Sequence, residues 1–493
     1  MSPPPSAAPD DPPPAKAARA DPPPKPRPGD SARRGRQLFQ LGLGAAAAAM
    51  LYYAVTAKVR DVSHLYLGEI IIALSVLPGL RWAKQADFGL PLFEMYMLTS
   101  IGTYAIPLLS GQQEIENYDV DTITTAAFAV VLYQIAANIS YIYITARPKK
   151  TKFWREAVIS KDASRFLGYG MVVTTIYTIV SQFFPELIPS DLEGIARAVC
   201  LGVGMLATFI QARRWGDGEL PYYDKCIFLF QVILQVIFFW AALFLIQGIT
   251  VLMIALLGYV SGSRRIPVLA LCIALPITAL FHNGKSAMRA KYWSADNAPV
   301  VGVTDLPAFF GEWIGYGLHP PDQAEDSRKG VALLQRTSLI QMMCLVVSES
   351  PEHKPFLNGA TYKDVLAQFV PRFFWPGKPH VHASTYLMAI YYGLQDEEST
   401  MTTTIGFGTV TEAYANFGYF GMGAIGFFFA FFFKKIGGWS ANSPMLSYPG
   451  MFMVLLMAWS FQTELTLSDW LGSLYQASVV AIGVPFLWRN LLR

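Results

Sequence analysis

The side chains best suited to chemistry lie in one polar segment, residues 369–421, which begins FVPRFFWPGKPHVH and ends TEAYANFGYFG. Arg372 lies between a proline and a Phe-Phe-Trp run, and Lys378 lies within a Pro-Gly-Lys-Pro turn. Proline restricts the local backbone, and a guanidinium can bind phosphate oxygens through two parallel hydrogen bonds. The segment therefore predicts a site for a phosphorylated group, with Arg372 as its principal cation.

Four other basic or polar positions could contribute to such a site. Lys285 and Arg289 are four residues apart, so on a helix they share a face. Arg336 interrupts an apolar helical pattern, and Arg197 lies near the outer end of an apolar span, where an arginine is costly. Two alternatives remain open, because Lys285 could reach lipid headgroups and Arg336 could pair with an acid of its own loop.

A transfer to a hydroxyl group also requires a proton acceptor. Glu412 lies at the head of an apolar span, close to Tyr414 and Asn416, where an acid is costly and suggests function. His380 and His382 follow the proline segment and could accept the proton instead, although histidines in exposed loops are often inert.

Other candidate groups give weaker predictions. Glu69 and Glu94 lie inside apolar spans, where they could line a lipid groove or satisfy polar neighbours between helices. The acidic run at 396–398 is expected to face water. The four cysteines show no disulfide framework and no metal-ligand spacing, so neither a metal nor another cofactor is expected.

The elements that must position these groups are membrane-spanning helices. Hydrophobic residues make up 53% of the 493 positions and charged residues only 15%, against about 25% charged in soluble proteins. A spanning helix needs about 20 mainly apolar residues. We expect an all-α polytopic membrane protein with about twelve such helices, at 37–56, 62–80, 91–110, 122–145, 166–184, 193–212, 225–245, 247–262, 266–282, 408–433, 448–465 and 470–488.

The distribution of Lys and Arg predicts the orientation of these helices. With the N-terminus inside, the tails and inner loops hold 24 of these residues and the short outer loops hold 2. Basic residues are concentrated on the cytoplasmic side. Both termini are therefore expected in the cytoplasm, with the long loop between the ninth and tenth spans on the outer side.

The chain divides into four parts. Residues 1–36, with three Pro-Pro-Pro runs, are expected to form a disordered cytoplasmic tail. Residues 37–282 would hold the first nine spans and residues 408–493 the last three. The outer loop at 283–407 is expected to fold as a helical cap, with helices near 306–318, 330–351 and 362–371.

Several motifs resemble those of the Wzy-type oligosaccharide repeat-unit polymerases. VPRFFWPGKP followed by TEAYANFGYFG is similar to the family's pattern, as is the order LLQRTSLIQMMCLVVSESP and LNGATYKDVLAQ upstream. GKSAMRAKYW, which leaves the ninth span, also resembles the family's Lys–Arg segment. The resemblance covers about residues 284–425.

The resemblance implies a metal-independent, GT-C-like glycosyltransferase of a bacterial inner membrane, with the long loop in the periplasm. It would polymerise undecaprenyl-pyrophosphate-linked repeat units for O-antigen or exopolysaccharide. Donor and acceptor would both be lipid-linked oligosaccharides, a chain-length regulator could assist, and no nucleic acid is implied. Arg372 and Arg336 would stabilise the leaving pyrophosphate, helped by Lys285, Arg289, Lys378 and Arg197.

Three other functions remain open. A lipid-carrier glycan ligase would share the cap and the basic residues and differ only in its acceptor. A polysaccharide flippase or transporter belongs to another class, and the absence of an internal repeat argues against it. A non-catalytic membrane subunit would tolerate loss of Arg372, Arg336 and Glu412 together.

Overall fold

The structure is a computed structural model that describes most of the chain. The described residues are 28–84, 90–146, 157, 163–188, 190–243, 245–292, 302–319, 338–370, 374–375, 377–379, 382–400, 404–440 and 443–491. Within these residues the protein is all-helical and contains no strand. The all-α architecture expected from the sequence is therefore confirmed.

Each expected span coincides with helix. The main helices are α1 (Pro28–Thr56), α2 (Val62–Lys84), α3 (Leu92–Ser100), which continues through a π-helical turn into α4 (Ile106–Leu109), α6 (Val120–Tyr143), α8 (Ala163–Phe183), α9 (Ser190–Gly216), α10 (Tyr222–Ala241), α11 (Leu245–Ser263), α12 (Val268–Tyr292), α18 (Thr409–Ser440), α19 (Tyr448–Trp459) and α20 (Leu467–Leu491).

Nine helices of the described chain are long and apolar enough to cross a membrane. The expected number of twelve is not established, because α9, α11 and α19 do not meet the same criterion, and the apolar parts of α11 and α19 are short. The N-terminal boundary also differs from the expectation. α1 begins at Pro28, so residues 28–36 are helical and do not form part of an extended tail.

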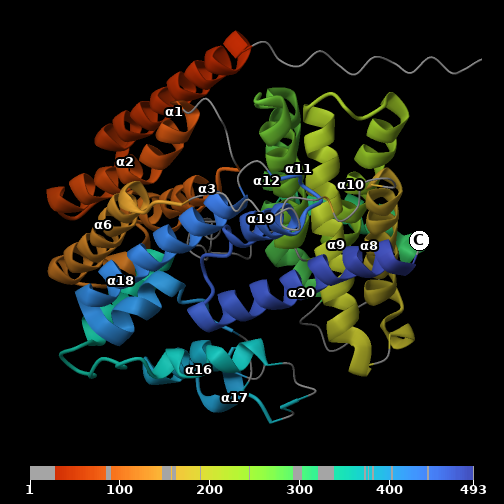
Figure 1. Ribbon diagram of the computed structural model, residues 1–493. Coiled ribbons are helices and arrows are strands. Elements are labelled where there is room, and N and C mark those ends of the chain that lie inside the picture. The colour runs from red at the N-terminus through yellow and green to blue at the C-terminus, as the bar shows by residue number, and fades with distance from the viewer. Residues whose placement is uncertain are drawn as a thin grey trace, which may run out of the picture.

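The helices form two groups that are joined by the last two helices (Figure 1). In one group α1 packs on α2, α2 on α3 and α6, and α6 on α18. In the other, α9 packs on α8 and α11, and α10 packs on α11. α19 and α20 contact both α9 and each other, and α19 also contacts α3, so they connect the two groups.

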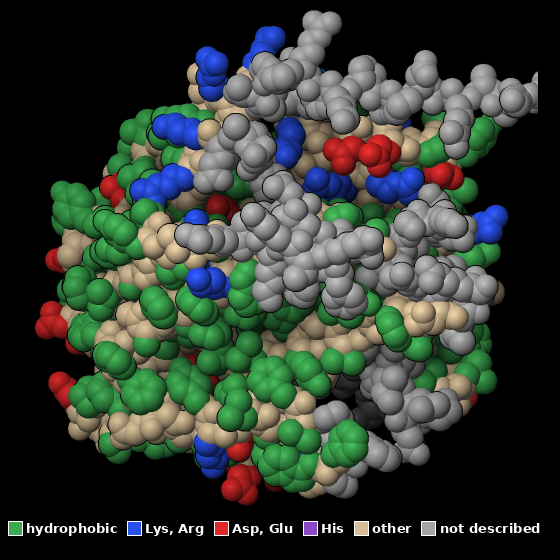
Figure 2. Space-filling view, in the orientation of Figure 1, with side chains coloured by type: hydrophobic (Ala, Val, Ile, Leu, Met, Phe, Trp, Pro, Cys, Tyr) green, Lys and Arg blue, Asp and Glu red, His purple; other side chains and the backbone are tan. Residues whose placement is uncertain are grey.

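The outer surface matches a bilayer environment. Figure 2 shows a broad band of apolar side chains, while Lys and Arg gather toward the end of the molecule where α1 begins. Large apolar side chains on several of the long helices are exposed, among them Leu51, Val55, Tyr143, Leu269 and Phe420. A soluble surface rarely carries so much contiguous apolar area. The structure therefore supports a helical membrane protein.

The described parts of the segment at 283–407 contain short helices, one of which packs into the main core. These helices are α13 (Leu306–Leu318), α15 (Leu339–Glu349), α16 (Ala383–Tyr391) and α17 (Glu397–Thr400). α15 packs against α6 and α18, and its apolar face lies in the main hydrophobic core. The helix expected at 362–371 is replaced by two short 3-10 turns, Ala360–Tyr362 and Leu366–Phe369.

α18 is broken at Gly418, which has φ 58° and ψ −139°. Only glycine adopts this backbone conformation without strain. The chain is therefore two helices, residues 409–417 and 419–440. The carbonyl groups at the end of the first helix accept hydrogen bonds from outside, with the amide of Leu357 donating to Ala415 O at 2.9 Å and the amide of Asn358 donating to Asn416 O at 3.2 Å.

The break in α18 predicts a specific glycine requirement. Gly418→Ala should lower the melting temperature of the detergent-solubilised protein by several degrees, because the conformation would be strained by about 1–3 kcal/mol. The new Cβ would also come within 2.9 Å of the Phe356 ring. In Gly423→Ala, the matched control, the new Cβ meets no atom within 4 Å, so its melting temperature should not fall. Equal melting of the two variants would contradict the break.

Candidate functional site

A cavity of 540 Å³ with both polar and apolar lining lies between α3, α8, α9, α10, α11, α15 and the turn that joins α19 to α20. Its polar lining consists of Thr99, Thr103, Thr174, Thr208, Thr250, Thr463, Gln235, Gln247, Gln462 and Glu464. The hydroxyls of Thr99, Thr103 and Thr174 donate to backbone carbonyls, and each retains lone pairs that can accept a further hydrogen bond. These side chains could hydrogen-bond the hydroxyl groups of a ligand, while the rest of the lining is apolar.

The α19–α20 turn holds Glu464, the one carboxylate among the described residues that line this cavity, in place. Gly408, with φ 78°, donates its amide to Glu464 O at 2.9 Å, and Thr409 Oγ1 donates to Leu465 O at 2.8 Å. A Cβ at Gly406 would lie 2.9 Å from Glu464 Cβ. The two glycines before α18 therefore allow the chain to approach the turn closely, and this contact positions Glu464.

Glu464 is available for acid–base chemistry. Glu464 keeps access to solvent, and it also lines the cavity, where protein atoms surround part of its side chain. Desolvation by the surrounding protein raises the pKa of Glu464 above its ordinary value. A raised pKa brings a carboxylate closer to the neutral range in which a general base is most effective.

Two buried carboxylates lie at the beginning of α20, directly after this turn. Glu412 is 0% exposed and its Oε2 accepts a hydrogen bond from the amide of Leu467, the first residue of α20, at 2.6 Å. The first amides of a helix have no partner within the helix, and the helix dipole favours an anion there. Glu412 therefore caps α20 from another helix.

The second carboxylate, Asp469, is 1% exposed and meets three side chains. Its Oδ2 accepts hydrogen bonds from Thr385 Oγ1 at 2.8 Å and Thr466 Oγ1 at 2.9 Å. Its Oδ1 lies 3.2 Å from His382 Nδ1. The hydrogen bond with Asp469 raises the pKa of His382, whose side chain is 46% exposed. Asp469 thus orients a histidine that solvent can reach.

Asn416 connects this cluster to the loop before it. Its Nδ2 donates to Thr361 Oγ1 and to Glu412 O, both at 2.8 Å, and its Oδ1 accepts the Gly359 amide at 2.8 Å. Glu412 and Asn416 are four residues apart and therefore lie on one face of the short helix. The TEAYANF helix is held by this face between α20 and the 359–361 loop.

The structure places the other described candidates elsewhere. Tyr414 is buried against the rings of Phe356 and Tyr419. Lys378 is buried, and its Nζ donates to Val370 O at 2.9 Å and Gln368 O at 3.3 Å. Lys285 and Arg289 are half-buried on α12, where Arg289 Nη2 donates to Leu243 O at 2.9 Å. α12 packs mainly on α13, so these two residues belong to a different helical hairpin from Glu412.

The remaining candidates are not described. Arg372, Arg336 and His380 lie outside the described residues. Arg197 lies on α9, but its side chain is not among those described. Among the residues that the structure does describe, no group of three or more His, Cys, Asp or Glu could hold a metal ion.

Sequence reasoning did not identify Glu464, Asp469, Thr385 or Thr466. A sign of them is present in FQTELTLSDW (461–470), where polar residues separate two apolar runs. The argument that singled out Glu412, an acid at the head of a span, applies equally to Asp469. Both acids bind residues far away in the sequence: Glu412 binds the Leu467 amide, and Asp469 binds Thr385. These partners cannot be identified from the sequence.

The His382–Asp469 pair predicts pH-dependent stability. The pKa of His382 is higher in the folded protein than in the unfolded chain. The pair therefore stabilises the fold fully at a pH below the unfolded pKa, and this stabilisation is lost as the pH rises through the folded pKa. The melting temperature of the wild type should therefore exceed that of His382→Gln by more at about pH 5.5 than at about pH 8.5. His353→Gln, which replaces an exposed histidine, should show no such trend. A pH-independent difference for His382→Gln would contradict the pairing.

Comparison with known proteins gives a family but no activity. No curated protein and no solved structure matches this chain. A family model described as a domain of unknown function, DUF8712, matches residues 93–443. The match covers well over half of the chain and runs from the start of α3 to the end of α18. The protein is therefore a member of the DUF8712 family.

Proposed function

We propose that this protein is a membrane glycosyltransferase that polymerises oligosaccharide repeat units carried on a polyprenyl pyrophosphate. The observation that carries the proposal is the 540 Å³ cavity, whose threonine, glutamine and glutamate side chains suit a carbohydrate. A hydroxyl-rich ligand needs such groups, because a buried polar atom without a hydrogen-bond partner is costly. The resemblance to Wzy-type polymerases in residues 284–425 supports the same class of substrate.

The expected orientation of the helices in the membrane gives a second argument for this function. Arg81 and Lys84 end α2, and Arg213 and Arg214 end α9, at the basic end of the molecule. With that end in the cytoplasm, the α19–α20 turn and Glu464, which come at the outer end of the span expected at 448–465, would lie on the outer side. The cavity would then receive repeat units at the outer face of a bacterial inner membrane.

The reaction would be a group transfer between two lipid-linked glycans. A hydroxyl oxygen of the acceptor sugar attacks the anomeric carbon of the donor chain and forms the new glycosidic bond. The bond between that carbon and the pyrophosphate oxygen breaks, and the carrier pyrophosphate leaves with the electron pair. The acceptor proton passes to a base, for which we propose Glu464 because it faces the cavity and has a raised pKa.

The other groups would support this step. Glu412 and Asp469 act as positioning residues, since both are buried and both hold the α20 end of the turn. Negative charge develops on the departing pyrophosphate, so fixed cations should stabilise it. For that role we propose Arg372 first and Arg336 second, from their sequence context.

Two other functions have support. A ligase that transfers finished glycan to a different acceptor would use the same cavity and the same bond changes. A transporter is favoured by one observation, the break of α18 at Gly418, because discontinuous helices form the substrate sites of many transporters.

Deletion of the gene separates these functions. A polymerase predicts that single repeat units accumulate on the carrier, accessible from the outer face, when polyprenyl-linked glycans are measured by mass spectrometry. Accumulation of long polymer on the carrier would indicate a ligase. Single units that accumulate facing the cytoplasm would indicate a transporter and would contradict the proposal.

The role of Glu464 predicts a defined loss of turnover. Glu464→Gln should slow chain extension by about 10²–10⁴-fold at unchanged protein level, because an amide cannot accept the proton. Glu398→Gln, a change at an exposed acid, is the matched control and should retain wild-type extension. Wild-type extension by Glu464→Gln would exclude it as the base.

The role of Arg372 is tested separately. Arg372→Lys and Arg372→Ala should both abolish chain extension while membrane levels stay normal, since lysine cannot form the paired hydrogen bonds to phosphate. Extension by Arg372→Ala at the wild-type rate would remove this residue from the proposed site.

A further inference from the structure

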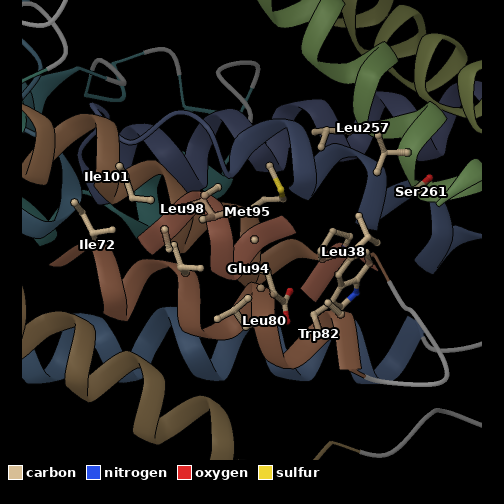
Figure 3. A pocket seen from close by; sticks show the side chains of 18 of the residues that line it. Leu38, Ile72, Leu80, Trp82, Glu94, Met95, Leu98, Ile101, Leu257 and Ser261 are labelled. Atoms are coloured by element: carbon tan, nitrogen blue, oxygen red, sulfur yellow. The ribbon is translucent and has the colours of Figure 1, made fainter. Parts of the chain in front are cut away.

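A second cavity, of 370 Å³, lies near the other end of the helices, between α1, α2, α3 and α11 (Figure 3). It shares no lining residue with the cavity that contains Glu464. Both cavities border α3, α11 and α19, but each is lined by different residues of these helices. On α19, for example, Met457 lines one cavity and Ala458 lines the other. The second cavity is therefore a separate compartment that the proposed transfer reaction does not use.

Small residues create this space. Gly42, Ala45, Ala46 and Ala49 line it from one face of α1. On the opposite wall, a Cβ built at Gly79 of α2 meets no atom within 4 Å. The apolar stretch of α1 has no buried residues, so this helix forms the outer wall of the cavity toward the lipid.

One carboxylate interrupts these apolar walls. Glu94 of α3 is only 6% exposed and lines the cavity together with Leu80 and Trp82 (Figure 3). Tyr141 donates a long hydrogen bond of 3.4 Å to its Oε1, and Lys434, whose ammonium lies 4.4 Å from the centre of the Tyr141 ring, interacts with this carboxylate electrostatically. An acid at such a position is costly unless it has a function.

We propose that this cavity binds a lipid whose polar end is an uncharged hydroxyl group, with the hydroxyl on Glu94 and the hydrocarbon chain along α1 and α2. The shape and the apolar walls fit a hydrocarbon chain. A carboxylate can bond a hydroxyl in either protonation state, because it accepts when ionised and donates when protonated. When it is ionised, the same carboxylate repels a phosphate, and the site then discriminates against phospholipids and against phosphorylated carriers.

Photo-crosslinking in lipid nanodiscs tests this site. The probes are a long-chain isoprenoid alcohol with a diazirine on its chain and the phosphate ester of the same alcohol, in phosphatidylethanolamine and phosphatidylglycerol. The alcohol should label peptides of α1, α2 and α3, and the phosphate should label them about tenfold less, as expected for one hydrogen bond to a charged group. Equal labelling by the phosphate would overturn the proposal.

Substitutions distinguish binding in the cavity from labelling by lipid on the outer surface of the helices. Glu94→Leu removes the carboxylate that would bind the hydroxyl group of the lipid. Gly79→Leu places a side chain in the cavity, and its Cβ would have no protein atom within 4 Å. Both should reduce labelling by the alcohol about tenfold. Gly44→Leu is the matched control, because Gly44 is exposed on the opposite face of α1 and a Cβ there also meets no atom within 4 Å.

Labelling that persists in Gly79→Leu would show that the alcohol binds elsewhere and would overturn the proposal, even if Glu94→Leu failed to fold. The outcome does not depend on the proposed glycosyltransferase activity, since the readout is binding alone.

Discussion

The arrangement of the site depends on two carboxylates that are buried at the start of α20. A buried carboxylate is costly unless hydrogen bonds replace part of its lost hydration, and here the hydrogen bonds come from different parts of the chain. Glu412 reaches the Leu467 amide from the broken helix α18, while Thr385 and Thr466 donate to Asp469 from α16 and from the turn before α20. These contacts fasten three segments to one helix end, where the helix dipole also favours negative charge.

These contacts also hold the turn that lines the 540 Å³ cavity. The turn between α19 and α20 is held at one end by the two acids and on its side by Gly406 and Gly408. It can therefore present Glu464 at a fixed place among the threonine and glutamine side chains of the surrounding helices. The long segment between α12 and α18 contributes α15 to the core and His382 to the acid cluster, so it is part of the site's framework.

Much of this fold could be predicted from the sequence because apolar runs of about 20 residues identify membrane helices directly. The importance of Glu412 and Asn416 could also be inferred, since polar residues at the head of a span are costly. The partner of Glu412 could not, because Leu467 lies 55 residues away and offers only a backbone amide. The break at Gly418 was likewise hidden, because a glycine within an apolar helix does not indicate a positive φ by itself. Arg372 and Arg336 stay sequence-based hypotheses.

The most direct test of the central claim is reconstitution of the purified protein in liposomes with one defined polyprenyl-pyrophosphate-linked repeat unit. The account predicts a ladder of lipid-linked products that differ by one repeat unit, with release of the free polyprenyl pyrophosphate in equal amount. Movement of the intact repeat unit across the bilayer without any longer product would contradict it, because the cavity would then serve transport and not glycosyl transfer.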